Sequence, residues 1–149
     1  MSDWLEHTVQ IEVNHPVERI WALWANIEMM PRWMKWIQAV HITPDNPSLS
    51  SWELGSNGFT FTWRSRILKQ IPNQIIQWES IDGLPNRGAI RFYGRPESTI
   101  VKMTISYAIP GIIGHLMDDI FLGRMVESTL MADLERFRDY ADTITDRAS

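Results

Sequence analysis

The sequence predicts an α+β domain in which a curved antiparallel sheet of six to seven strands wraps around one long C-terminal helix. Apolar and polar residues alternate through most of residues 7–109, and the segments that alternate are joined by connections of hairpin length. After Pro110 and Gly111 the apolar residues recur three and four positions apart. Alternating strands leave one sheet face apolar, and the last helix is the only predicted element large enough to cover it. The 149 residues suit one domain over 1–149.

The N-terminal part of the chain is expected to form one strand and two short helices. The strand is expected over His7 to Asn14, where apolar residues occupy every second position. Pro16 then fits the first turn of a helix, where its missing N–H costs nothing, with Asn14 or His15 as the cap. A second short helix is expected over Met29 to Trp36.

The rest of the chain divides into strands and the long helix. Six strands are expected at Ile37–Thr43, Leu49–Leu54, Phe59–Gln70, Gln74–Ile81, Arg87–Arg95 and Ser98–Ile109. Arg64, Glu79 and Arg91 are expected to pair across strands on the outer face. The helix is expected over Ile112 to Ile144, with residues 145–149 as a frayed tail.

The composition narrows the class of protein. Eight tryptophans fall within the first 78 residues, which is more indole than a core of this size needs. The chain has no cysteine, so disulfides, thiolate catalysis and zinc–sulfur sites are excluded, and a reducing, cytoplasmic setting is expected. The net charge of −4 and the absence of a basic run argue against nucleic acid as a partner. The first residues do not have the pattern of a signal peptide, and no stretch is apolar enough to span a membrane.

Three stretches carry a family resemblance. Pro16–Trp21 opens the first helix, Met30–Trp36 holds a Pro-Arg-Trp sequence, and the start of the expected final helix contains glycine. With the predicted order of elements, they resemble the START-like (SRPBCC) superfamily, in its polyketide cyclase/dehydrase and coenzyme Q-binding branch. Residues 73–80 look like uncharacterised cyanobacterial members. The resemblance implies the helix-grip fold. Members of this superfamily include lipid carriers, quinone-binding proteins and polyketide aromatase/cyclases.

In a helix-grip fold, the ligand lies between the concave sheet face and the long helix. The residues expected there are apolar or aromatic, with Trp36 closing one end. The predicted ligand-binding residues are Trp36, Phe61, Trp63, Trp78, Phe92, Met103, Tyr107, Met117, Phe121 and Met125. The alternative is that these side chains pack against one another as a solid core. His115 and Tyr107 are the candidate acid/base residues, although a surface His and a satisfied buried Tyr explain them as well.

Three functions remain open on these residues. The first is binding, and transport, of an apolar small molecule such as a lipid, isoprenoid quinone or polyketide-like compound. The second is a cyclase/dehydratase acting on a polyketide-like substrate, which the nearly all-apolar inward positions disfavour. The third is a protein-interaction module. The histidines lack metal-ligand spacing, so no metal and no cofactor are expected. The loop at residues 83–86 is a candidate for peripheral membrane contact, or a hairpin loop with a tucked leucine.

Overall fold

The computed structural model describes residues 4–56, 58–108 and 119–148, and their side chains except those of residues 56, 59, 119–123 and 145–148. The described elements are β1 (Trp4–Val13), α1 (Val17–Ala25), the 3-10 helix η1 (Ile27–Arg32), β2 (Ile37–Thr43), β3 (Asn46–Ser56), β4 (Phe59–Ile71), β5 (Ile75–Gly83), β6 (Asn86–Gly94), β7 (Thr99–Ala108) and α3 (Asp119–Ala148).

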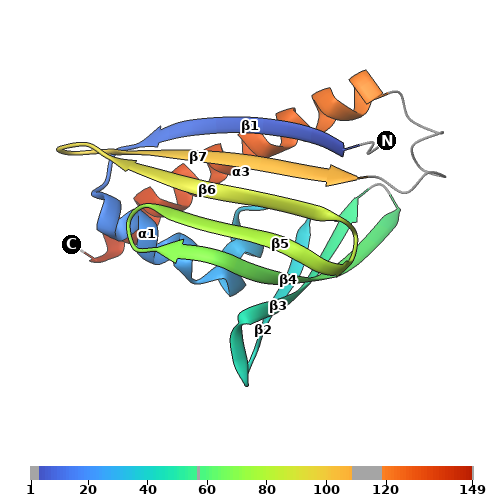
Figure 1. Cartoon of the computed structure of the whole chain (residues 1–149). Coiled ribbons are helices and arrows are strands. Elements are labelled where there is room, and N and C mark those ends of the chain that lie inside the picture. The colour runs from blue at the N-terminus through green and yellow to red at the C-terminus, as the bar shows by residue number, and fades with distance from the viewer. Residues whose placement is uncertain (1–3, 57, 109–118, 149) are drawn as a thin grey trace.

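The seven strands form one sheet in the order β1-β7-β6-β5-β4-β3-β2, and every neighbouring pair is antiparallel (Figure 1). All connections but one join strands that are adjacent in both sequence and space. The exception is β1, which pairs with β7 along ten residues. That pairing places the first strand beside the last described strand, so residues about 100 positions apart become neighbours.

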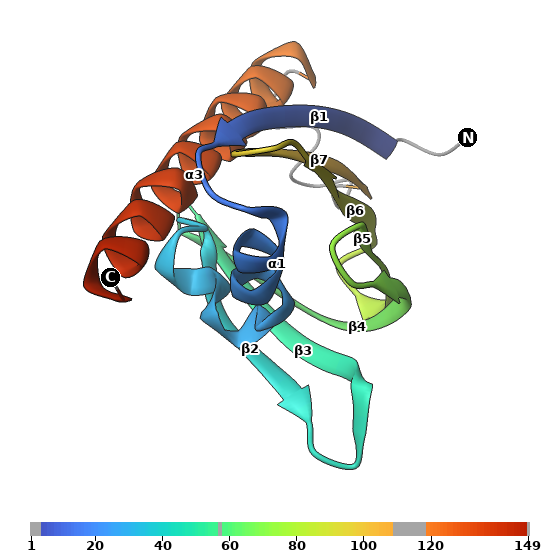
Figure 2. The same cartoon turned by 90° about the vertical axis from the view of Figure 1, so that its left-hand side faces the viewer.

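The long helix α3 lies behind the sheet along β1, and α1 lies across one end of the curved sheet (Figures 1 and 2). We call that end, where β1 finishes and β7 begins, the α1 end. The other end, where β1 begins and β7 finishes, is the distal end. The face toward α3 is the inner face, and the main apolar core lies between it and the helices. The chain therefore has the α+β helix-grip fold that the sequence predicts.

The alternation of side chains is confirmed on the strands that carry it most clearly. On β4, Trp63 and Ser65 are buried on the inner face while Arg64 and Arg66 are exposed. On β1 the buried residues include Val9 and Val13. Because the period of a strand is two, the sequence pattern was enough to assign these faces.

The short helices differ from the prediction. Pro16 is the N-cap of α1 rather than a first-turn residue, with extended backbone dihedrals. Its carbonyl accepts the N–H groups of Arg19 and Ile20, and neither Asn14 nor His15 caps the helix. The second helix is the 3-10 helix η1, which ends at Arg32, four residues earlier than expected. Pro31 lies inside η1 and has no N–H to continue a ladder, which limits the element to a short length.

The C-terminal helix is described from Asp119 onward. It continues to Ala148, through positions where fraying is expected. The part of the expected helix before residue 119 lies outside the described residues. In the described part of the chain, no helix is long and apolar enough to cross a membrane.

Candidate functional site

The inner face is an aromatic and methionine-rich wall, and its α1 end is closed by packed rings. Trp24 of α1, Trp33 and Phe137 of α3 contact one another at centroid distances of 4.9–5.2 Å. Tyr140 lies 5.3 Å from Trp33, and Trp21 meets Phe92 edge to face. The first three rings are almost fully buried. This end of the inner face is a solid core.

The distal end carries a buried histidine and tyrosine. His7 of β1 is 9% exposed, and its Nε2 lies 3.1 Å from the hydroxyl oxygen of Tyr107 on β7. The two rings are stacked, with centroids 5.7 Å apart. On the other side of the imidazole, Nδ1 lies 3.8 Å from a carboxylate oxygen of Glu127 on α3. A carboxylate, an imidazole and a phenol thus follow one another in a chain.

The environment keeps the phenol of Tyr107 protonated. Burial raises the pKa of Tyr107 to about 12, because the low-polarity surroundings disfavour the phenolate. At neutral pH the hydroxyl therefore stays available as a hydrogen-bonding group.

Trp78 and Asn86 form a second polar contact near that end. The indole N–H of Trp78 donates to Oδ1 of Asn86 over 3.3 Å. The Trp78 ring crosses the sheet above Gly88, where a β-carbon would approach the ring to 2.6 Å. Glycine at position 88 thus makes room for the indole, and Asn86 satisfies its only donor.

Trp63 differs from its aromatic neighbours. It stacks almost flat on Trp52 across the β3–β4 ladder, with centroids 5.8 Å apart. The indole N–H of Trp52 donates to Oγ of Ser50 over 2.7 Å. The N–H of Trp63, a residue 8% exposed, is buried and has no hydrogen-bond partner among the described residues. A buried donor left unpaired costs about 1–3 kcal/mol.

The indole N–H groups of Trp24 and Trp33, and the hydroxyl of Tyr140, are also buried without a partner in the described structure. These groups belong to the ring cluster of the α1 end, where neighbouring aromatic side chains surround them. Trp63 lies outside that ring cluster, and the aromatic contact that it makes among the described residues is with Trp52.

The structure brings most of the predicted binding residues to the inner face. Trp63, Phe92, Met103 and Tyr107 are buried in the main core. Trp36, Trp78 and Met125 are half-buried and pack against it, and Phe61 is half-buried opposite Leu54 on β3. His115 and Met117 lie outside the described residues, as does the side chain of Phe121 in α3.

Sequence reasoning missed His7, Asn86 and Glu127. His7 has the same strand parity as Val9, which is the signal that could have placed it on the inner face. Asn86 was expected in a loop and instead begins β6. No sequence signal pairs Glu127 with residue 7, since the contact depends on how α3 lies along β1.

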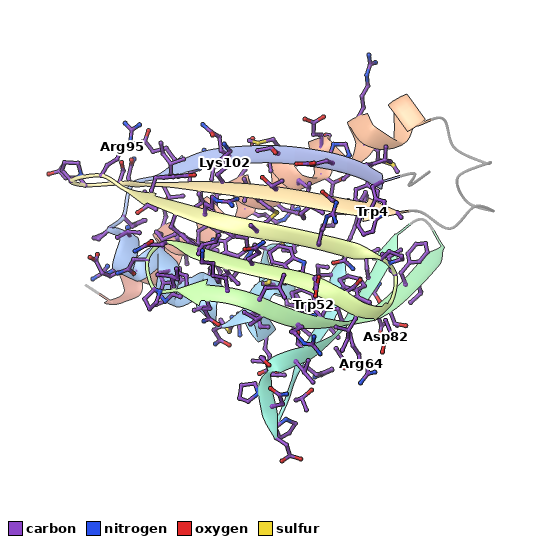
Figure 3. All side chains as sticks on the ribbon, viewed as in Figure 1. Trp4, Trp52, Arg64, Asp82, Arg95 and Lys102 are labelled. Carbon is purple, nitrogen blue, oxygen red and sulfur yellow. The ribbon has the colours of Figure 1, made fainter. Side chains whose placement is uncertain are left out.

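A hollow with a volume of about 340 Å³ lies over β2 to β5. It is lined by Ala39, His41, Ser51, Trp52, Glu53, Thr62, Trp63, Arg64, Asp82 and Gly83. At its edge, Nε of Arg64 donates to Asp82 over 2.7 Å (Figure 3). The expected pairing of Arg64 with Glu79 is therefore wrong: Glu79 lies opposite Arg66, and a bulge between Arg64 and Ser65 brings Asp82 opposite Arg64. The lining is mixed, since the charged residues Glu53, Arg64 and Asp82 stand beside Trp52 and Trp63.

The loop between β5 and β6 is folded back onto the sheet. The N–H of Leu84 donates to the carbonyl of Thr62, and the Leu84 side chain packs against the core. Gly83 has a φ of +80°, and a β-carbon there would come within 2.2 Å of the same carbonyl. Pro85 is thus the exposed apolar residue of this loop.

Residues 13–135 match the polyketide cyclase/dehydrase and lipid transport family, so the chain belongs to that family. It has START-like architecture. A 17.2 kDa uncharacterised protein of Streptomyces lincolnensis is 24% identical over 133 residues, which cover 89% of this chain and 86% of that protein.

Two solved structures show the same fold. A START superfamily protein from Mycobacterium smegmatis has a TM-score of 0.74 at 14% identity, covering 93% of this chain and 98% of that one. The Zhui aromatase/cyclase from a Streptomyces species has a TM-score of 0.71 at 17% identity, covering 93% and 94% of the two chains. The family and the fold suggest a protein that binds a hydrophobic ligand or acts as a polyketide cyclase.

Proposed function

We propose that this protein binds, and carries within the cytoplasm, an apolar small molecule with at least one oxygen acceptor, held at the distal end of the inner face. Lipids, isoprenoid quinones and polyketide-like compounds fit this description. The observation that supports it best is the buried indole N–H of Trp63, which no described residue satisfies. A ligand carbonyl or hydroxyl oxygen on that N–H would recover the cost of the unpaired donor.

Aromatic and methionine side chains that pack against the core support an apolar body for the ligand. Trp52, Trp78 and Met125 are half-buried around the core, and aromatic and methionine side chains adapt to irregular apolar shapes. Burial of ligand surface contributes about 25 cal/mol per Å² before ordering costs. The affinity would then come from the apolar wall and the orientation from the few polar groups.

The first test is native mass spectrometry of the protein purified from its own host, with organic extraction of whatever accompanies it. We expect a stoichiometric apolar compound that contains oxygen. An empty protein that also fails to bind a panel of lipids, quinones and aromatic polyketides would contradict the proposal.

A conservative variant tests the role of the indole N–H. Trp63→Phe keeps most of the ring and removes the donor, so affinity for an oxygen-bearing ligand should fall about tenfold, which corresponds to 1.4 kcal/mol. Trp4→Phe is the matched control, because Trp4 lies under the guanidinium of Arg87, away from the core cluster. Equal affinities for wild type and Trp63→Phe would show that the N–H does not bind the ligand.

The second candidate function is a cyclase/dehydratase acting on a polyketide-like substrate. The inward-facing His7 and Tyr107 favour it, since they are titratable groups on an otherwise apolar wall. With such a substrate, His115→Ala should abolish turnover if His115 is the acid/base residue and leave binding intact. Trp63→Ala should weaken binding under either function.

A further inference from the structure

We infer that Glu127, His7 and Tyr107 form a proton relay that accepts the proton of an acidic hydroxyl on the ligand, an enol or a phenol. This inference rests on the proposed function, because it needs a ligand at the distal end. It adds the chemical class of the ligand and a role for residues that binding alone does not use.

The three groups come from three elements and are ordered from solvent to interior. The Glu127 side chain on α3 is 54% exposed, whereas His7 and Tyr107 are buried. Glu127 faces Nδ1 of the imidazole at 3.8 Å, and the Tyr107 hydroxyl faces Nε2 at 3.1 Å. Of the described residues, these two are the titratable groups that contact His7. The relay thus runs from an exposed carboxylate to a buried phenol.

Strand pairing does not account for this arrangement. β1 and β7 already pair at ten successive positions, so the two strands do not need a His–Tyr bond to stay together. A buried imidazole instead carries a desolvation cost that an apolar residue at position 7 would avoid. The pair therefore calls for another explanation.

The carboxylate biases the tautomer of His7. The negative charge of Glu127, 3.8 Å from Nδ1, favours the tautomer with its proton on Nδ1, and Nε2 then accepts the hydrogen bond of the Tyr107 hydroxyl. The phenol oxygen of Tyr107 then keeps its remaining lone-pair direction for a ligand O–H. Because burial disfavours the phenolate of Tyr107, this residue donates its proton to His7 only as it accepts the proton of the ligand, and it remains a phenol.

The proton transfer balances without any further reactant. The ligand O–H bond breaks and its proton moves to the Tyr107 oxygen, while the Tyr107 proton moves to Nε2 of His7. The products are a bound enolate or phenolate and an imidazolium next to Glu127. No bond to carbon changes and nothing is oxidised or reduced. The imidazolium and the carboxylate attract each other, which favours the charged state of the ligand.

The test uses 2-naphthol as the probe, since its anion absorbs at longer wavelengths than the neutral form and than tryptophan. Absorbance is followed against pH for the free probe and for the probe bound to wild-type protein. We expect the ratio of naphtholate to naphthol to rise at least about tenfold on binding at a given pH. His7→Gln and Tyr107→Phe should abolish the rise, and Glu127→Gln should reduce it.

Two controls separate the relay from a merely structural role. Glu135→Gln removes another exposed carboxylate of α3 that makes no contact with His7, and it should behave as wild type. Glu127 is exposed, so Glu127→Gln should fold even if a substitution of His7 does not. The methyl ether of 2-naphthol has no acidic proton, and it should bind wild type and Glu127→Gln equally.

The outcomes distinguish the two proposals. If 2-naphthol and its ether both bind but the naphthol titrates as it does free in solution, the relay is wrong and the binding function stands. The relay is also wrong if Glu135→Gln lowers the naphtholate ratio as much as Glu127→Gln does. If neither compound binds and no other apolar compound does, the binding function and the relay fail together.

Discussion

The α1 end and the distal end of the inner face use similar residues in different ways. At the α1 end, Trp24, Trp33 and Phe137 pack against one another, and the indole N–H groups of both tryptophans have no partner in the described structure. At the distal end, Tyr107 faces His7, Trp78 donates to Asn86, and Trp63 has a free indole N–H in the described structure. Aromatic rings enclose one another at the first end and present polar atoms at the second.

The difference shows what an aromatic-rich wall can do. Rings that contact one another exclude both water and ligand, so the α1 end contributes stability. Rings that carry paired and unpaired polar groups contribute less to packing and can orient a ligand. The comparison predicts that stability should depend mostly on the α1 end and ligand recognition on the distal end.

The largest expected effect on stability is at the α1 end. Trp33→Ala removes a buried ring that contacts Trp24, Phe137 and Tyr140, so the free energy of unfolding should fall by about 3–5 kcal/mol. Urea denaturation followed by circular dichroism measures it. Tyr93→Ala is the control, since this exposed ring should change stability by less than about 0.5 kcal/mol. A loss at Trp33 no larger than at Tyr93 would break the comparison.

The buried carboxylate of Asp133 should have the next effect. It accepts the N–H of Lys35 over 3.0 Å and pairs with Arg136, anchoring α3 to the chain before β2. Asp133→Ala leaves the Lys35 N–H unpaired and should lower the free energy of unfolding by about 1–3 kcal/mol. Equal urea midpoints for this variant and wild type would contradict the role.

The same residue gives a pH dependence with a definite sign. Burial raises the pKa of Asp133 above its ordinary value of 3.8, against the opposing hydrogen bonds from Lys35 and Arg136. The folded protein then holds the proton of Asp133 more tightly than the unfolded chain does. The free energy of unfolding therefore falls as the pH rises from the ordinary pKa of 3.8 through the raised pKa of the folded protein. Asp133→Asn has no carboxyl group to ionise at this position. The free energy of unfolding of the variant, relative to that of wild type, should therefore increase from pH 3 toward neutrality. A constant difference across that pH range would show that the pKa is not raised.

At the distal end, Tyr107→Phe should cost about 1 kcal/mol, because it removes one hydrogen bond and keeps the ring. Thermal and urea denaturation measure the change. A loss as large as that of Trp33→Ala would mean that the distal end is as much a structural core as the α1 end.

The smallest effect is expected on the outer face. Arg64 and Asp82 are exposed, so the ion pair between them is screened by solvent and salt. The pair lowers the pKa of Asp82, so its small contribution is present above the ordinary value of 3.8 and is lost as the pH falls below it. Arg64→Ala should leave the urea midpoint at neutral pH within error. A clear loss that persists in high salt would show that this ion pair is structurally important.

Most of the fold was predictable because it depends on local patterns. Alternation assigned the faces of β4 and β6, and the change of period after residue 110 predicted the final helix. The short helices were less predictable. Whether residues 27–32 form an α-helix or a 3-10 helix depends on which side chains the core accepts, and Ile27 and Met30 are the ones buried.

The candidate site was predictable only as a set of apolar wall residues. Trp63, Met103 and Tyr107 face inward because of strand parity, which the sequence displays. The contacts of His7 were not predictable, since Tyr107 is 100 residues away and Glu127 lies on another element. The pairing of Arg64 with Asp82 was not predicted for a related reason. A bulge shifts the register between β4 and β5, and no local sequence pattern indicates that bulge.

The sequence by itself determined the class of fold, the order of elements and the face on which each strand residue lies. These properties follow from the periods of strands and helices, which are local. Tertiary structure alone decided which polar atoms meet, because the β1–β7 pairing and the path of α3 along β1 set those distances. The His7, Tyr107 and Glu127 chain exists only once three distant segments have been packed together.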